Sequence, residues 1–195
     1  MAIQPGRNQL GTDRGHIIVR TGRDGLAATA GHDLTIELTR WSGVLTVTED
    51  LSPGSLEVRI DMRSLLVRDG TGGLKPLTDR DKREAALTAG KVLRTQRSPE
   101  AAFSAAEFGP GIAGGGVISG NLTLAGITRP LHLQVSKTGQ DAYQATASVV
   151  QSHFGIKPYS GFLGALKVRD NVDIEVSIDL SGPTATRELP GGERT

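Results

Sequence analysis

Residues 120–135 alternate apolar and polar side chains in two short runs, and this alternation strongly limits what the chain can fold into. In the first run Leu122 and Leu124 fall on one face, with polar residues between them. After a break at residues 126–130, the pattern resumes over residues 131–135. A period of two is the pattern of a β-strand that buries one face, so this segment predicts two antiparallel strands joined at a hairpin corner.

The same alternation recurs along most of the chain, between turn signals. Its clearest instance is residues 171–180, where an apolar residue stands at every second position. The predicted strands are 13–21, 26–39, 41–48, 56–63 with an extension over 65–68, 102–108, 117–125, 131–137, 143–154 and 171–180. The pattern therefore predicts an all-β fold, a single antiparallel β-barrel of about eight strands.

One inserted segment has the composition of a helix instead. Residues 79–93 are rich in strong helix formers, and Thr78 before them has a hydroxyl suited to capping a helix N-terminus. Leu87 and Ala89 belong to a thin apolar stripe along this segment. Gly90 is expected to end or break the helix, because glycine is a poor helix former.

The domain organisation follows from the extent of these patterns. The barrel is predicted to occupy residues 12–181 as one domain. Residues 1–11 are expected to be a disordered lead. Residues 182–195, rich in Pro, Gly and charge, are expected to be a disordered tail.

Charge and composition exclude several classes of function. The 22 basic and 21 acidic residues give a net charge of +1, which provides no global attraction to nucleic acid or to an anionic membrane. The chain has no cysteine, so disulfides and thiolate chemistry are excluded. No window approaches the roughly 18 apolar residues that span a bilayer, and the first ten residues lack the apolar core of a signal peptide. We therefore expect a cytoplasmic protein without stable membrane insertion.

Residues 120–133 also carry a family pattern. They read GNLTLAGITRPLHL, and this run closely resembles the G-x-L-T-[IL]-x-G-x-T-[RK]-P-[VIL]-x-L pattern of the YceI-like proteins. Asp13, His16 and the run Phe154-Gly155-Ile156 match further family positions. Gln151 and His153 stand where relatives usually have Arg and Asp. The resemblance covers roughly residues 12–181.

The resemblance implies both a fold and a function. YceI-like proteins are lipocalin-like barrels that hold a polyisoprenoid or another long apolar chain. By this resemblance the chain is a non-enzymatic carrier or sequestering protein for an isoprenoid lipid, a quinone or a fatty-acid derivative bound in the barrel lumen. No cofactor, catalytic residue or metal is predicted. The predicted partner is an apolar small molecule, and a homodimer is a possible assembly.

The candidate ligand-binding residues come from three observations. Residues 154–166 concentrate apolar side chains in a glycine-containing loop, which predicts either a plug over the barrel end or a gate. Basic residues near loop ends, Lys167 among them, are either surface charge or a positive rim for an anionic head group. By strand parity His32 points inward. The candidate residues are His32, Leu34, Ile36, Phe103, His153, Phe154, Tyr159, Phe162, Leu163, Arg129, Lys157 and Arg169.

Two other functions stay open at this point. A barrel enzyme would use His32 and His153 with a metal or as acid and base, although no two of the four histidines are spaced like ligands on one element. A barrel filled by its own side chains would act as a structural or partner-binding module. Residues 109–114 satisfy G-x-G-x-x-G in form, but a strand rather than a helix is predicted to follow, so this pattern indicates a hairpin.

Overall fold

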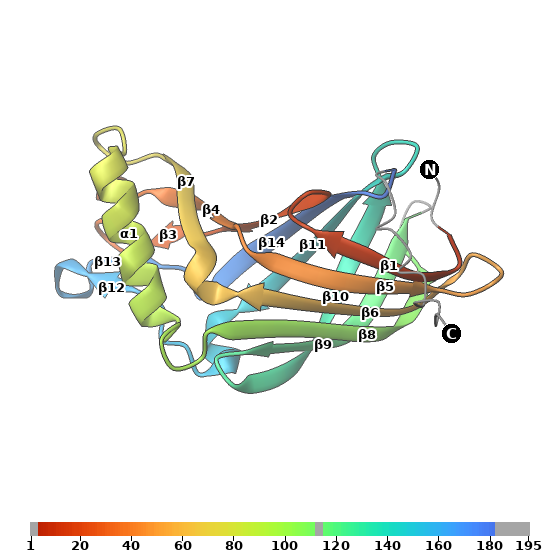
Figure 1. The fold of residues 1–195 in the computed structure, drawn as a ribbon. Helices are drawn as coiled ribbons and strands as arrows, with labels where there is room; N and C mark the ends of the chain where they lie inside the picture. Colours follow the sequence, from red (N-terminus) through yellow and green to blue (C-terminus); the bar gives the residue numbers. More distant parts are fainter. Residues whose placement is uncertain (1–3, 112–114, 182–195) are drawn as a thin grey trace, which may run out of the picture.

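The computed structural model of the protein describes residues 4–111 and 115–181. Its main feature is an antiparallel sheet in the order β1-β5-β6-β8-β9-β10-β11-β14-β2-β4-β7, which curls around a central axis (Figure 1). The strands are β1 (Gly6–Gly11), β2 (Gly15–Arg20), β4 (Asp33–Leu38), β5 (Trp41–Val47), β6 (Pro53–Asp61), β7 (Leu65–Thr71), β8 (Glu100–Pro110), β9 (Gly116–Leu124), β10 (Ile127–Lys137), β11 (Ala142–Val150) and β14 (Asn171–Asp179). The prediction of an all-β barrel is confirmed.

Three long strands are each divided at a bend, so this sheet has 11 strands in the described residues rather than about eight. Residues 39–40 separate β4 from β5, residues 12–14 separate β1 from β2, and the short 3-10 helix η2 (Met62–Ser64) separates β6 from β7. β5 lies near one end of the sheet order and β4 near the other. The continuous chain between them therefore closes the curled sheet into a barrel.

Helix α1 (Asp79–Val92) lies across one end of the barrel and packs against β7 (Figure 1). The Thr78 hydroxyl accepts a hydrogen bond from the Asp81 N–H, and the Asp81 carboxylate accepts one from the Thr78 N–H, so the predicted cap is a full capping box. The expected end at Gly90 is wrong, because the helix continues to Val92. A helical glycine costs about 1 kcal/mol, and the side chains of Val92 and the following Leu93 line the barrel interior.

A small sheet lies at the same end of the barrel as α1 (Figure 1). It has the order β12-β13-β3 and consists of β3 (Arg23–Asp24), β12 (Ser160–Gly161) and β13 (Leu166–Val168). The short 3-10 helices η1 (Ala28–Ala30) and η5 (Phe162–Gly164) adjoin it. The first half of the strand predicted over residues 26–39 is wrong, because residues 26–32 contain η1 and only residues 33–38 belong to β4.

Two other segments differ from the sequence prediction. Residues 6–11, expected in the disordered lead, form β1 and pair with β5. An edge strand gains main-chain hydrogen bonds whatever its side chains, and Leu10 adds one apolar side chain to the core. Residues 151–154, expected to continue a strand, form the 3-10 helix η4 (Gln151–Phe154). The tail, residues 182–195, lies outside the described residues.

The hairpin at the centre of the sequence pattern is confirmed. β9 and β10 pair from Leu124↔Ile127 to Gly116↔Val135. The turn is shorter than the expected break at 126–130, because only Ala125 and Gly126 form it, with φ of 51° and 81°. Two successive positive φ angles match the right-handed twist of a tight hairpin. Of the segment 109–114, residues 112–114 lie outside the described residues, while Gly109 and Pro110 belong to β8, which pairs with β9 as far as Pro110↔Gly116.

One charged group is buried on the barrel wall. Glu37 on β4 is 9% exposed. Its carboxylate accepts a hydrogen bond from His16 Nδ1 at 2.8 Å and another from Arg68. The hydrogen bond from His16 lowers the pKa of the Glu37 carboxyl below its ordinary value, burial opposes this shift, and Arg68 adds to it. The cluster ties β2, β4 and β7 together on the outer face.

Candidate functional site

The barrel encloses a cavity of about 610 Å³ that runs from α1 to the opposite end of the barrel. At the α1 end it is lined by Ala85, Ala89 and Val92, and at the opposite end by Val47 and Val117. Among the described residues that line this lumen, none carries a charge. Small-molecule sites have volumes of about 300–1,000 Å³ and are mostly apolar, so the lumen is of a size and chemistry suited to one apolar ligand.

The interior is hollow rather than packed. On β14 the side chains of Ile174, Val176 and Ile178 face the lumen and yet are only half-buried. In the described part of the chain, Ile156 is the sole large side chain below 2% exposed. A close-packed protein interior leaves few voids larger than a water molecule. The protein's own side chains therefore do not fill this barrel, and the filled-barrel alternative is not supported.

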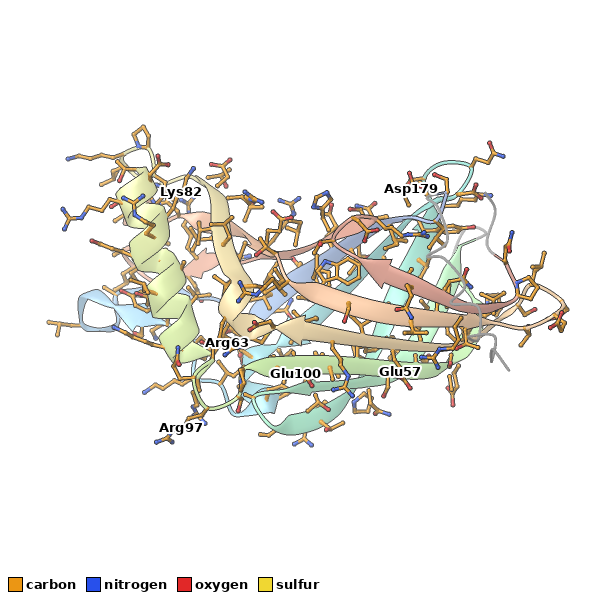
Figure 2. All side chains as sticks on the ribbon, viewed as in Figure 1. Glu57, Arg63, Lys82, Arg97, Glu100 and Asp179 are labelled. Carbon is orange, nitrogen blue, oxygen red and sulfur yellow. The ribbon has the colours of Figure 1, made fainter. Side chains whose placement is uncertain are left out.

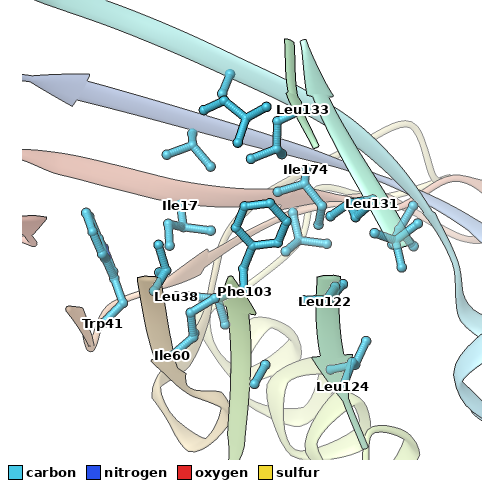
Figure 3. Close-up of a pocket in the computed structure, with 18 of the residues that line it drawn as sticks. Ile17, Leu38, Trp41, Ile60, Phe103, Leu122, Leu124, Leu131, Leu133 and Ile174 are labelled. Carbon is cyan, nitrogen blue, oxygen red and sulfur yellow. The ribbon is translucent and has the colours of Figure 1, made fainter. Parts of the chain in front are cut away.

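Two aromatic side chains project into the middle of the lumen. Phe103 on β8 lies at the centre of Figure 3, with Trp41 on one side and Leu122 and Leu131 on the other. Gly120 on the neighbouring β9 makes room for the Phe103 ring, because a Cβ there would lie 2.7 Å from Phe103 Cζ. These aromatic and aliphatic side chains together make this part of the lumen wall apolar.

Trp41 carries an unusual polar group. Its indole Nε1 is buried and is the one buried side-chain nitrogen or oxygen in the described residues without a hydrogen-bond partner. A buried donor without a partner costs about 1–3 kcal/mol. Trp41 is also the only tryptophan of the chain and lines the lumen. Its fluorescence is therefore a direct reporter of lumen occupancy.

The structure places four of the predicted ligand-binding residues on the lumen wall: Leu34, Ile36, Phe103 and Tyr159. Phe154 is buried beside Val149, Ile156 and Val172 but does not line the cavity. Of the candidates, His32, His153, Leu163, Arg129, Lys157 and Arg169 also lie off its wall. The side chain of Phe162 lies outside what the structure describes.

The two histidines of the enzyme alternative have other surroundings. His32 precedes the first residue of β4, so strand parity does not extend to it, and its Nε2 forms a hydrogen bond with the Lys75 carbonyl oxygen at 2.8 Å. His153 is exposed on η4. In residues 4–111 and 115–181, no three His, Asp or Glu side chains gather as a metal site would require.

Most lumen residues were not singled out from the sequence. The inward faces of β9 and β14 and the α1 residues Ala85, Thr88 and Ala89 supply much of the wall. The strand positions follow from the same alternation that predicted the strands, so parity could have named them. The helix positions required knowledge of which face of α1 meets the barrel. Its outward Leu87 is 68% exposed, so the predicted stripe does not include this leucine.

Three loops and α1 surround the lumen at one end, and we call them the helix-end rim: α1 with residues 22–32, 72–78 and 157–169. Hydrogen bonds join the loops. Ala27 N–H donates to the Ala165 carbonyl at 2.8 Å, and His32 bonds the Lys75 carbonyl. Lys157, Lys167 and Arg169 lie on this rim and form no ion pair with a described residue. Arg129 is exposed on β10, where its guanidinium donates to the Thr128 carbonyl.

Comparisons with known proteins agree with this geometry. The model of the YceI-like domain matches residues 16–180. The crystal structure of BcnA from Burkholderia cenocepacia is similar, with 15% identity and a TM-score of 0.58, over 86% of this chain and 96% of BcnA. A mutant of the Campylobacter jejuni YceI protein has 15% identity and a TM-score of 0.52, over 74% of this chain and 83% of that one. At these identities the likeness shows a shared fold. No curated protein matches the sequence.

Proposed function

This chain belongs to the YceI-like family, and from that premise we propose that its barrel carries or sequesters one long apolar molecule without covalent chemistry. The observation that carries the proposal is the hollow lumen of about 610 Å³ with no charged side chain on its described wall. In such a cavity the affinity comes from the apolar surface that the ligand removes from water rather than from a specific polar contact.

Burial of the ligand chain supplies the affinity. Each methylene removed from water contributes about 0.8 kcal/mol. A ligand that buries about ten methylenes gains roughly 8 kcal/mol before the costs of association. A chain of that length needs no strong polar anchor.

The shape and charge of the lumen support an isoprenoid lipid, a quinone or a fatty-acid derivative as the ligand class. The lumen extends along the barrel from α1 to the far end, so it suits an extended chain. A charged head group would be costly inside a wall without charges. Such a head group is expected at the helix-end rim, beside Lys157, Lys167 and Arg169.

No observation favours the enzyme alternative. Acid–base catalysis requires a titratable side chain within hydrogen-bond reach of the bound substrate. His32 and His153 do not line the lumen, and the wall residues with polar side chains are Thr21, Trp41, Thr88, Tyr143, Gln151 and Tyr159. The binding proposal accounts for the apolar wall, and the catalytic one does not.

Extraction of the purified protein with organic solvent, followed by mass spectrometry, tests the proposal. We expect an isoprenoid, quinone or acyl lipid in a fixed ratio to protein. Ala145→Trp places a large ring in the lumen and is expected to abolish the bound lipid. Thr146→Trp is the matched control, because Thr146 is the exposed neighbour on the same strand. Equal lipid in both folded variants would place the ligand outside the lumen and overturn the proposal.

Titration of the protein with a short-chain ubiquinone gives a second readout. A quinone bound in the lumen is expected to quench the fluorescence of Trp41 saturably. Thr146→Trp adds a second tryptophan on the outer face, whose fluorescence is expected to persist at saturation. Quenching of both to the same degree would indicate collision in solution rather than binding.

A further inference from the structure

Exposed apolar side chains are concentrated at the helix-end rim. Seven large hydrophobic side chains are exposed in the described residues, and five of these belong to the rim. They are Leu26 at 100%, Leu74 at 79%, Leu87 at 68%, Tyr159 at 39% and Leu163 at 110%. On the surface of a soluble protein, exposed apolar residues are usually isolated. Their concentration around one end of the lumen therefore indicates a surface that contacts a partner.

The rim holds these leucines outward on an ordered frame. Leu26 and Leu74 lie on loops that are joined through the hydrogen bond between His32 and Lys75. Leu163 has a positive φ of 55°, in the left-handed region that favours glycine. A leucine held in that conformation and fully exposed gains nothing from packing within the chain.

Helix α1 has two faces with different roles. Ala85 and Ala89 line the lumen. On the opposite face, Leu87 stands between Arg83 and Lys91, one turn away on each side. Residues four apart on a helix are neighbours. A leucine flanked by cations on an outward helix face is the pattern of a helix that lies in a membrane interface.

The rim and the residues that follow α1 carry a net positive charge, although Arg23 pairs with Asp33 and Arg80 with Glu84. Residues 91–97 contain Lys91, Arg94 and Arg97 and no carboxylate, and residues 157–169 likewise contain three basic residues and no carboxylate. None of these six cations forms an ion pair with a described residue. On the barrel wall, Arg20 pairs with Glu175 and Arg59 with Glu100. Figure 2 shows Lys82 and Arg97 at the helix end and Asp179 at the other end.

We propose that the helix-end rim docks on an anionic membrane surface. The leucines enter the boundary between head groups and acyl chains, and the surrounding cations contact the anionic head groups. The α1 end of the lumen then faces the bilayer, which shortens the path that an apolar ligand must take through water. This inference extends the proposed function to the place where ligand is exchanged. Docking itself needs no ligand and can be tested separately.

A bilayer suits this surface better than a protein partner does. The four leucines project from separate segments and are too exposed to pack against one another as a flat patch. A protein interface requires a contiguous, complementary surface of about 800 Å² on each partner. The lipids of a bilayer surface move, so they can surround side chains that project separately. Anionic lipids can also diffuse to unpaired cations.

Flotation of the full-length protein with vesicles tests the proposal. We expect binding to vesicles of phosphatidylcholine with phosphatidylserine and weak binding to phosphatidylcholine alone. Arg83→Glu with Lys91→Glu is expected to weaken binding at least about tenfold, because each basic residue near an anionic surface contributes about 1 kcal/mol. Leu74→Ser with Leu87→Ser is expected to lower binding even at high salt, where screening has removed most of the charge attraction.

Matched controls lie away from the rim. Arg7→Glu with Lys137→Glu makes the same change of charge, and Leu66→Ser removes an exposed leucine from the barrel wall. Both are expected to bind vesicles as the wild type does. If the wild type fails to bind anionic vesicles, or the control variants lose as much binding as the rim variants, membrane docking is wrong. Lipid extracted from the lumen would still support the carrier function in that case.

Discussion

His32 and Lys75 are joined by a hydrogen bond of 2.8 Å between the imidazole Nε2 and the main-chain carbonyl oxygen. The bond connects the segment before β4 with the loop that leads into α1. Because a carbonyl only accepts, Nε2 carries the proton. His32, which was predicted to point into the lumen, instead fixes a loop of the helix-end rim.

His32→Ala is expected to loosen this loop without emptying the lumen. Loss of one such hydrogen bond costs about 0.5–1.5 kcal/mol. The free energy of local opening of residues 72–78 should decrease by this amount. Hydrogen exchange followed by mass spectrometry measures this opening. His153→Ala is the control and should leave exchange in that loop unchanged. Loss of bound lipid in His32→Ala would instead assign this side chain to the ligand site.

Glu37→Gln is expected to lower the free energy of unfolding by about 1–2 kcal/mol at neutral pH, since the bonds from His16 and Arg68 lose their charge assistance. The pKa of the Glu37 carboxyl is lowered in the folded protein from an ordinary value of 4.5. The carboxylate therefore stabilises the fold above that value, and its contribution is lost as pH falls through the lower folded pKa.

Urea unfolding at a series of pH values checks this expectation. The difference between wild type and Glu37→Gln should be constant above the unfolded pKa and should shrink in acid. Glu57→Gln is the control, because Glu57 is exposed on β6 and its substitution should change stability little at any pH. A difference that grows in acid would contradict the lowered pKa of Glu37.

Trp41→Phe is expected to change the free energy of unfolding by less than about 1 kcal/mol, because removal of a buried N–H without a partner offsets the loss of apolar contact from the smaller ring. Trp41→Ala removes the ring as well and is expected to cost about 3–5 kcal/mol. Urea denaturation followed by circular dichroism compares the two. A Phe variant as unstable as the Ala variant would contradict this offset.

Gly120→Ala is expected to destabilise the barrel by about 1–3 kcal/mol through overpacking. The added methyl would lie 2.7 Å from Phe103 Cζ and 2.4 Å from the Ser104 carbonyl oxygen, and a backbone atom cannot easily move away. Gly109→Ala on the paired strand is the control, since nothing lies within 4 Å of its Cβ position. In thermal unfolding, Gly120→Ala should have a clearly lower midpoint temperature than Gly109→Ala. Equal midpoints would contradict the steric clash.

The strands were predictable because one of their faces meets an apolar interior. Residues 171–180 show this best: the alternation there is unbroken, and β14 occupies 171–179. The hairpin after Leu124 was predictable for the same reason. The helix start at Thr78 followed from local chemistry, since a capping box requires only residues three apart.

Other features depend on contacts that a local pattern does not contain. The bend at Met62–Ser64 between β6 and β7 is set by closure of the barrel, so residues 65–68 were predicted only as an extension of the strand before them. The helix passes Gly90 because packing of Val92 outweighs a weak local preference. His32 stands one residue before β4, where parity has no physical meaning, so its position could not be read from the residues that follow.

The pairing of β2 with β14 has a consequence for how the protein is made. Arg20 and Glu175, which form an ion pair across these strands, stand 155 positions apart in the chain. Such distant partners meet late, because a long loop must close before their contacts form. On the ribosome, the wall therefore stays unsealed until the last strand has emerged. The nascent chain exposes the apolar inner face of the sheet throughout that interval. An apolar ligand present at that time can be enclosed as the final strand joins.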